Sequence, residues 1–308
     1  MQQSIVNRAV ASKLYYLKNG CYYTHSLWDG LVFNKFKALL GGNVRMMVTG
    51  SAPINPDVLT FLKVCFCSPI HEGYGQTESS AASCLTSGFD PVAGHVGGPN
   101  TCIRIRLKDI PEMQYLHTDP NPRGEVCYQG SSIFKGYFKN DEKTKEALSE
   151  DGWLASGDVG MVMPNGSLKI IDRAKNIFKL AQGEYIAPEK LENVYITSPY
   201  VAQIYVHGES TEAWLMAVMV PDMGEVKKLC LEKGWAKEGE DLNPLLSKVD
   251  LHKAILDNFL ELAKANKLSG LEKIKKLHID SEPMTIENGL LTPTMKIKRN
   301  IAKQQYLQ

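Results

Sequence analysis

The segment at residues 168–195 constrains the fold of this chain most, because it combines four local signals in a fixed order. It opens as the apolar run LKIID, turns through the charged residues 172–175 and bends again at Gly183. Pro188 suits the first turn of a helix, where its missing N–H leaves no hydrogen bond unmade. The segment therefore predicts a join between two folded units. The alternative is a plain surface connection with solvated lysine and arginine side chains.

Length and composition are those of a soluble globular protein. The 308 residues allow one large domain or two domains of ordinary size. Hydrophobic residues make up 44% of the chain and charged residues 22%, which is ordinary for such proteins. The formal net charge is only +1. Bulk charge therefore gives no reason to expect a nucleic acid or a membrane surface as a partner.

The cysteine pattern indicates a reducing, intracellular compartment. Seven cysteines at irregular spacing do not form a disulfide framework. Cys65, Cys67 and His71 lie close together, but no second pair follows at zinc-site spacing, and we interpret them as structural. The first residues show no signal peptide, and no apolar run reaches the roughly 20 residues that a membrane-spanning helix needs.

An apolar run, a turn of small residues and a helix start predict an α/β unit in the first half. Residues 44–48 are interpreted as a buried strand, and TGSAP at residues 49–53 forms the turn. Residues 55–57 are typical of a helix start. Because ligands bind beyond the carboxyl ends of strands in such units, Gly50 and Ser51 are candidate ligand contacts. The apolar face of the helix is expected to contain Val58, Phe61, Leu62 and Cys65.

The segments that follow predict loops and short strands. Residues 70–99 are rich in glycine and serine and are interpreted as loops around a ligand site. Strands are predicted at residues 101–107 and 124–129, and a hairpin at residues 158–172. The pair Asn165-Gly166 predicts a two-residue turn in this hairpin.

After residue 175, the sequence pattern changes to that of a small α+β unit. A helix is predicted at residues 188–196, followed by strands at residues 201–208 and 213–221. An amphipathic helix is predicted near residues 250–268, with Gly270 as its end. The expected domains are a large α/β domain at residues 1–172, a hinge at 173–175 and a small mobile domain at 176–308.

The motif EGYGQTE at residues 72–78 carries the sharpest chemical signal. Glycines on both sides of Tyr74 let the backbone pass close to a flat ligand on which the ring can stack. The hydroxyl of Thr77 and nearby backbone N–H groups suit a phosphate, and the carboxylate of Glu78 suits Mg²⁺. A surface loop with a packed tyrosine is the alternative.

Three further polar residues suit a nucleotide. Asp158 follows a glycine turn, and its carboxylate can accept both hydroxyls of a ribose. Arg173 offers a planar fork of donors to the same sugar or to a phosphate. Lys296 lies on a polar tail that we expect to be flexible, and it is suited to stabilise charge that develops in a transition state. Taken alone, a Gly-Asp pair is very common and most often has no such role, and a solvated lysine is the alternative for Lys296.

Six segments, taken in order, resemble the adenylate-forming (AMP-binding) superfamily and, within it, the long-chain fatty-acid–CoA ligases. They are TGSAP at 49–53, EGYGQTE at 72–78, GEVCYQGSSIFKGY at 124–137, DGWLASGD at 151–158, IIDRAKNIFKLAQGEYIAPEKLE at 170–192 and NGLLTPTMKIKR at 288–299. The resemblance implies the C-terminal part of a large mixed-sheet adenylate-forming domain followed by a smaller α+β domain. The last two segments are specific to the long-chain branch.

The resemblance implies a two-step reaction. A fatty carboxylate attacks the α-phosphate of Mg·ATP to give an acyl-adenylate and pyrophosphate, and the thiol of coenzyme A then takes the acyl group and releases AMP. Tyr74 would stack on adenine, Thr77 would meet the α-phosphate and Glu78 would hold Mg²⁺. The residues that the resemblance assigns to the nucleotide are Gly50, Ser51, Ala52, Glu72, Gly73, Tyr74, Gly75, Gln76, Thr77, Asp158 and Arg173.

The resemblance also assigns roles to three lysines. Lys175 would be the hinge residue about which the small domain rotates between the two steps. Lys296 would serve adenylation by neutralising charge on the α-phosphate and the carboxylate. Lys179, on another face of the small domain, would line the site during thioester formation. The implied catalytic residues are thus Lys296, Lys179 and Thr77.

The sequence departs from the family pattern in one important respect. The family has a Ser/Thr/Gly-rich loop that ends in Pro-Lys-Gly and wraps the β- and γ-phosphates, and no such segment occurs here. Ser156 also stands where the family often has threonine. We therefore expect a fragment of a longer ligase.

Two alternatives remain for the function: a non-catalytic remnant that binds adenine nucleotides, or a CoA ligase for another carboxylate. The expected location is the cytoplasm or the cytosolic face of the endoplasmic reticulum, a peroxisome or a mitochondrion. Any membrane attachment would involve the missing upstream region.

Overall fold

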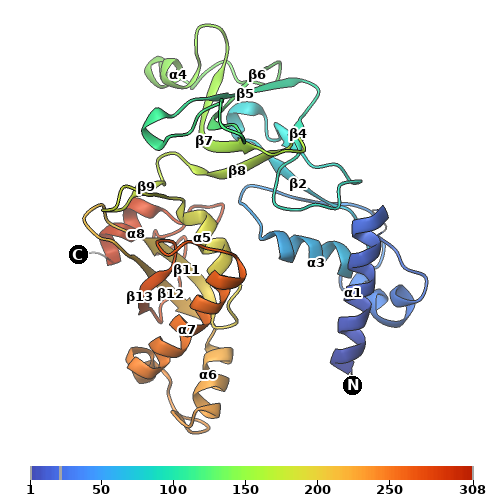
Figure 1. The fold of residues 1–308 in the computed structure, drawn as a ribbon, viewed down its shortest axis with the longest axis vertical. Coiled ribbons are helices and arrows are strands. Elements are labelled where there is room, and N and C mark those ends of the chain that lie inside the picture. Colours follow the sequence, from blue (N-terminus) through green and yellow to red (C-terminus); the bar gives the residue numbers. More distant parts are fainter. Residues whose placement is uncertain (1, 21–22, 307–308) are drawn as a thin grey trace. The chain divides into compact units, whose positions relative to one another are not determined.

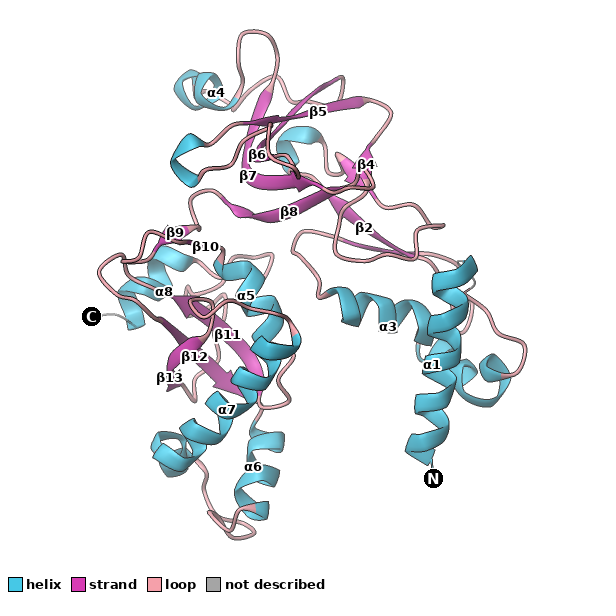
Figure 2. Ribbon diagram, viewed as in Figure 1, coloured by secondary structure: helices cyan, strands magenta, loops and turns pink. Residues whose placement is uncertain are grey.

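The computed structural model describes residues 2–20 and 23–306 and contains two compact units, which meet in the sequence between Ile171 and Asp172 (Figure 1). Each unit combines helices with sheet structure (Figure 2). The expected mixed α/β class is therefore confirmed. None of the helices in the described residues combines the length and the apolar content that crossing a membrane requires.

The first unit begins with a group of helices. They are α1 (Gln2–Gly20), the π-helical turn η1 (Asp29–Phe33), α2 (Asn34–Leu39) and α3 (Pro56–Phe66). The predicted start of α3 is confirmed, because Asn55 Oδ1 accepts the backbone N–H of Asp57 at 2.9 Å and Pro56 occupies the first turn. The buried core of this group includes Ala9, Leu17, Val32, Phe33 and Val64.

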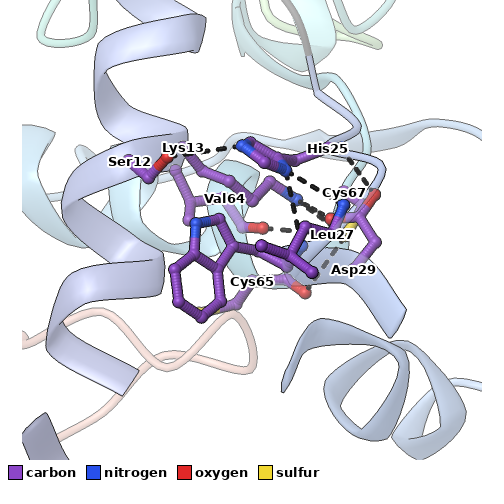
Figure 3. A network of polar contacts seen from close by, with 9 residues as sticks. Ser12, Lys13, His25, Leu27, Asp29, Val64, Cys65 and Cys67 are labelled. Atoms are coloured by element: carbon purple, nitrogen blue, oxygen red, sulfur yellow. Dashed lines mark hydrogen bonds and ion pairs between the residues drawn. The ribbon is translucent and has the colours of Figure 1, made fainter. Parts of the chain in front are cut away.

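A buried lysine ties these helices together (Figure 3). Lys13 in α1 is 1% exposed, and its Nζ donates to Asp29 Oδ1 at 2.7 Å and to Cys67 Sγ at 2.9 Å. The same ammonium lies 4.5 Å from the ring centre of Phe33. Burial acts to raise the pKa of Asp29, but hydrogen bonds from Lys13 and the backbone lower it below its ordinary value. Such local compensation is what makes a buried ammonium stable.

The first sheet has the order β1–β2–β3–β4. Strand β1 (Met47–Thr49) runs parallel to β2 (Ile70–Tyr74), whereas β3 (Cys84–Leu85) and β4 (Gly98–Pro99) add antiparallel pairs. The prediction of a buried strand at residues 44–48 is only partly correct, because a strand forms but is neither buried nor as early as predicted. The strand starts only at Met47, and Val48 is 60% exposed because no described element covers that face.

The predicted apolar face of α3 is only partly correct. Cys65 is buried and Leu62 is half-buried, but Val58 and Phe61 are exposed. The helix packs against α1 through a different side. Its buried residues are Leu59, Lys63, Val64 and Cys65. Helical spacing alone indicates an apolar stripe, but which part of the stripe is covered depends on the neighbouring helix.

A second sheet completes the first unit, in the order β5–β6–β7–β8. Its strands are β5 (Ile103–Lys108), β6 (Arg123–Gly130), β7 (Leu154–Val162) and β8 (Leu168–Arg173). The 3₁₀ turn η3 (Pro111–Met113) precedes β6, and the helix α4 (Asp141–Ala147) lies between β6 and β7 in the sequence. The predicted strands and hairpin are confirmed, but not the two-residue turn. Three residues separate Met163 from Ser167, which share a backbone hydrogen bond, and only Gly166 has a positive φ, of 81°.

The second unit is built on a three-stranded sheet in the order β11–β12–β13. Strands β11 (Val201–His207) and β12 (Leu215–Pro221) and the helix α5 (Pro188–Tyr195) confirm the predicted elements. A short hairpin of β9 (Phe178–Lys179) and β10 (Tyr185–Ile186) precedes α5. Residues from the sheet, α5 and the long helix α7 (Val249–Ala265) share one apolar core, which includes Leu191, Tyr195, Ala217, Met219, Ile255 and Phe259.

Several elements of the second unit were not predicted. These are α6 (Met223–Glu232), the 3₁₀ turn η4 (Asn243–Ser247), β13 (Ile274–Ile279) and α8 (Arg299–Tyr306). Helix α7 also ends at Ala265 rather than at Gly270. Lys267 adopts a φ of 54°, and Leu268 N donates to Ala263 O at 2.9 Å, which closes the helix before the glycine.

Candidate functional site

The motif at residues 72–78 joins a strand to a tight turn. Strand β2 ends at Tyr74, and the 3₁₀ turn η2 (Thr77–Ser79) follows. The side chain of Ser79 is buried, accepts the backbone N–H of Gln76 at 3.1 Å and donates back to Gln76 O at 3.0 Å. A Cβ at Gly75 would lie 1.9 Å from Ala81 O. Glycine is therefore required at position 75, because the backbone there passes very close to the backbone of Ala81.

The parallel pairing of β1 and β2 brings two predicted segments together. Thr49 lies opposite Glu72, so the turn at residues 50–52 follows β1 next to the EGYG residues. A Cβ at Gly50 would lie only 3.0 Å from Gly73 O, and Ser51 has a φ of 69°. The turn residues 50–52 are exposed. They form a solvent-accessible edge at the carboxyl ends of two parallel strands, where α/β units bind ligands.

Tyr74 and Asp158 form a direct pair within the first unit. The hydroxyl of Tyr74 donates to Asp158 Oδ2 at 2.7 Å, and Asp158 is buried in β7. Burial raises the pKa of Tyr74 well above its ordinary value, so the phenol remains a donor. The ring of Tyr128 lies 5.9 Å from that of Tyr74. The backbone N–H of Asp158 donates to Ser156 Oγ at 3.0 Å, a bond that a threonine hydroxyl could equally accept.

Glu72 lies beneath the exposed turn. The residue is only 6% exposed. Burial raises the pKa of its carboxyl to about 7, although a backbone hydrogen bond from Ile54 and the positive charge of Lys63 act to lower it. Among the described residues, Glu72 Oε2 and Gln76 Nε2 are buried polar atoms without a hydrogen-bond partner. The bond to Ile54 ties Glu72 to the segment that follows the 50–52 turn.

Thr77 and Glu78 lie at the accessible side of η2. Thr77 is exposed and Glu78 is half-buried. Glu78 Oε1 accepts the hydroxyl of Tyr137 at 2.7 Å. Sequence reasoning gave Tyr137 no role, although it lies in a quoted motif, because nothing local indicates that its hydroxyl reaches Glu78.

A divalent cation fits Glu78 only as part of a nucleotide complex. No group of three or more His, Cys, Asp or Glu side chains suited to a metal ion occurs in residues 2–20 and 23–306. Mg²⁺ is commonly held by one or two carboxylates together with water and substrate phosphates. An exposed edge with one carboxylate, Glu78, and one hydroxyl, Thr77, is compatible with that donor set.

The start of the second unit is organised by Asp172, which belongs to the charged segment 172–175 that the sequence indicated as part of the join. Asp172 is buried, and its oxygens accept the backbone N–H of Arg173 at 2.6 Å, Asn176 Nδ2 at 3.3 Å and the backbone N–H of Glu189 at 2.8 Å. Burial and the nearby Glu189 raise the pKa of Asp172 to about 6. Asp172 thus ties the turn that holds the exposed Lys175 to the first turn of α5.

The two lysines predicted to be catalytic lie on separate turns of the second unit. Lys179 is exposed on β9, and its Nζ lies 5.3 Å from the ring centre of Tyr185 on the paired strand. Lys296 is exposed in a turn that is closed by bonds from Thr292 N to Lys296 O at 2.8 Å and from Lys296 N to Thr292 Oγ1 at 3.0 Å. The tail expected to be flexible is therefore a defined turn here.

The predicted site residues thus divide between the two units. The first unit brings together the 50–52 turn, the 72–78 motif and Asp158. Arg173, at the end of β8, belongs to the second unit together with the three lysines. The roles assigned to these residues stay predictions.

Comparison with known proteins gives consistent matches. Residues 18–138 match the family model described as AMP-binding enzyme. The chain is 49% identical over 283 residues to human long-chain-fatty-acid–CoA ligase 1, covering 92% of this chain and 40% of that protein. It is 46% identical over 312 residues to long chain acyl-CoA synthetase 6, peroxisomal, of Arabidopsis thaliana, covering 100% of this chain and 44% of that protein. The chain therefore spans less than half the length of these curated relatives.

Solved structures show the same fold. The A domain of the carboxylic acid reductase from Segniliparus rugosus, in complex with AMP and a co-purified carboxylic acid, matches with a TM-score of 0.75 at 31% identity over 92% of this chain and 41% of that chain. The A-PCP didomain of the same reductase, in complex with AMP, covers 98% of this chain and 38% of that chain with a TM-score of 0.76 at 29% identity.

Proposed function

Because this chain belongs to the family of AMP-binding enzymes, we propose that it forms the C-terminal part of a ligase that joins a long-chain fatty acid to coenzyme A. The observation that carries the proposal is the identity of 46–49% with long-chain ligases and synthetases over 92–100% of this chain. A match of this extent includes residues of both units. The cluster of the 50–52 turn, Tyr74 and Asp158 in the first unit supports nucleotide binding.

The proposed reaction uses ATP, Mg²⁺ and coenzyme A. In the first step, an oxygen of the fatty carboxylate attacks the α-phosphorus of ATP, and the bond to pyrophosphate breaks. Tyr74 provides an aromatic face for adenine, while Asp158 and Arg173 bind the ribose hydroxyls. Thr77 donates to the α-phosphate. Glu78 would hold Mg²⁺, and the ion would supply positive charge to neutralise the phosphates.

Lys296 would complete the adenylation site, because an ammonium stabilises the negative charge that builds up on the α-phosphate and the carboxylate. In the second step, the sulfur of coenzyme A attacks the acyl carbon, and AMP leaves. We propose that rotation about Lys175 exchanges Lys296 for Lys179 between the two steps. The exposure of all three lysines supports such roles.

The location in the cell follows from the proposed substrate. We propose an intracellular enzyme, in the cytoplasm or on the cytosolic face of an organelle membrane. We propose that any attachment to that membrane is made by an upstream region of the longer protein. One relative carries the designation peroxisomal, which makes the peroxisome one of the organelles to examine.

The experiment is fatty-acid-dependent exchange of labelled pyrophosphate into ATP by the longer protein that contains this chain. We expect exchange with palmitate and none with benzoate. Exchange with benzoate alone would assign the enzyme to another carboxylate. AMP binding without exchange for any acid would support the non-catalytic remnant. Asp158→Ala serves as the site control, and loss of both AMP binding and exchange is expected.

A further inference from the structure

A segment without an assigned role holds Glu78 in place. Residues 132–137 connect β6 to α4, and the hydroxyl of Tyr137 donates to Glu78 Oε1 at 2.7 Å. The same segment is bonded to the backbone around Glu78. Phe134 N donates to Glu78 O at 2.8 Å, and Ser80 Oγ donates to Ser132 O at 2.8 Å. Three hydrogen bonds therefore join this segment to η2 and its C-cap residue Ser80, and one of them ends on the carboxylate itself.

The position of the Tyr137 hydroxyl is determined by its own surroundings. The backbone N–H of Tyr137 donates to Thr144 Oγ1 in α4 at 2.9 Å. Its ring packs edge-on against Phe134, with centroids 4.9 Å apart. The preceding Gly136 has a φ of 144°, and a Cβ there would lie 2.7 Å from Thr144 Cγ2. Glycine at this position lets the chain pass Thr144 closely enough to place the phenol over Glu78.

The bond occupies one oxygen of the carboxylate and leaves the other available. No hydrogen bond to Glu78 Oε2 occurs among residues 2–20 and 23–306, and the residue is only half-buried. The backbone of η2 is braced by Ser79, as described above. A carboxylate held at its backbone and at one oxygen presents its second oxygen in a fixed direction. Hydrogen-bonded partners orient metal-binding carboxylates in the same way.

We propose that Tyr137 is a positioning residue that orients Glu78 toward the Mg²⁺ of the bound nucleotide. The proposal rests on the proposed function, because it is the nucleotide complex that brings the cation. Tyr137 does not touch the cation. Its hydroxyl restricts the rotation of the Glu78 carboxylate, so that less conformational freedom is lost when the cation binds.

The test uses the longer protein that contains this chain, with the variant Tyr137→Phe. Equilibrium binding of a non-hydrolysable ATP analogue is measured by calorimetry over a range of Mg²⁺ concentrations, without fatty acid. The Mg²⁺ concentration for half-maximal binding is expected to rise about tenfold, while binding without Mg²⁺ stays unchanged. The control Tyr306→Phe removes a similar phenol–carboxylate bond, 3.0 Å long, to Asp280 in the second unit. It is expected to leave the Mg²⁺ dependence unchanged.

A double variant separates positioning from a general structural role. In a Glu78→Gln background, Tyr137→Phe is expected to have no further effect on the Mg²⁺ dependence. An equal shift in both backgrounds, or no shift in the wild-type background, would overturn the proposal. An equal shift in the Tyr306→Phe control would overturn it as well. If instead the wild-type protein binds no nucleotide, the proposed function itself has failed.

Discussion

Two lysines of the first unit and two of the second unit differ in how their charge is balanced. Lys13 and Lys63 are almost completely buried. Lys13 is surrounded by Asp29, Cys67 and an aromatic ring, and Lys63 donates to the carbonyl oxygen of Asp90 at 3.3 Å. In contrast, Lys179 on the short strand β9 and Lys296 in a closed turn are both exposed.

This difference separates structural lysines from lysines that can act on a ligand. Burying an ammonium removes its hydration, so the fold has to supply a carboxylate, a carbonyl or a ring in its place. Such a lysine is committed to those partners. An exposed lysine on a closed turn contributes little to stability, and its charge remains available to an incoming phosphate or carboxylate. The predictions that follow test this contrast.

The largest expected effect is on folding. Lys13→Met leaves the half-buried Asp29 without its positively charged partner, and we expect a loss of about 3 kcal/mol in the free energy of unfolding. Urea unfolding of this chain, followed by circular dichroism, measures the loss. Lys18→Met, at an exposed position of the same helix, is the matched control and is expected to change stability by less than about 0.5 kcal/mol. Equal losses of stability in the two variants would contradict the view that the buried lysine is structural and the exposed one is not.

The second-largest expected effect is on the rate of adenylation, with no change in the stability of the fold. In the longer protein, Lys296→Ala is expected to lower the rate of adenylation about 100-fold, because one preorganised charge in the transition state is lost. Thioester formation from supplied acyl-adenylate is expected to continue at nearly the wild-type rate. Both half-reactions are measured separately by quenched-flow assay. Lys264→Ala, an exposed change on α7, serves as the control, and equal loss of both half-reactions would refute the assignment.

The corresponding substitution at Lys179 is expected to have a smaller effect, on the rate of thioester formation. Lys179→Ala should lower the rate of thioester formation about tenfold and leave pyrophosphate exchange intact. Its Nζ lies near the ring of Tyr185 rather than in an ion pair, so the β9–β10 hairpin is expected to persist. A variant that loses exchange but keeps thioester formation would reverse the roles of the two turns.

The smallest effect concerns a buried acid of the first unit. Glu72 has a pKa of about 7 in the folded chain and an ordinary value of 4.5. Between these values the unfolded chain is ionised while the folded chain retains the proton, so the stability contribution is lost as pH rises. We expect unfolding free energy to fall by about 1 kcal/mol between about pH 5.5 and 6.5 through this group.

Glu72→Gln is the variant that tests the pH effect, because it keeps the shape of the side chain and removes its proton equilibrium. Urea unfolding is measured across the same pH range for both proteins. The variant is expected to show a flatter dependence of unfolding free energy on pH. An unchanged slope would show that Glu72 ionises normally in the folded chain.

Local sequence signals correctly predicted those features that a single short segment determines. The N-cap Asn55 and the first-turn proline Pro188 predicted the starts of α3 and α5, because both act on neighbouring residues of the chain. The motif at residues 72–78 and the charged turn after β8 were found for the same reason. Burial of Val48 and of Val58 and Phe61 on α3 was predicted incorrectly, since covering a face requires another element.

Amino-acid order alone therefore indicated the α/β class, the resemblance to adenylate-forming enzymes and the residues to which that resemblance assigns the chemistry. Tertiary structure alone revealed what holds those residues. Tyr137 reaches Glu78 across 59 positions and Tyr74 reaches Asp158 across 84, while Lys13 meets Cys67 across 54. The physical reason is that a hydrogen bond depends on distance in space, and distant segments come within reach only when the sheet and the helices between them have folded.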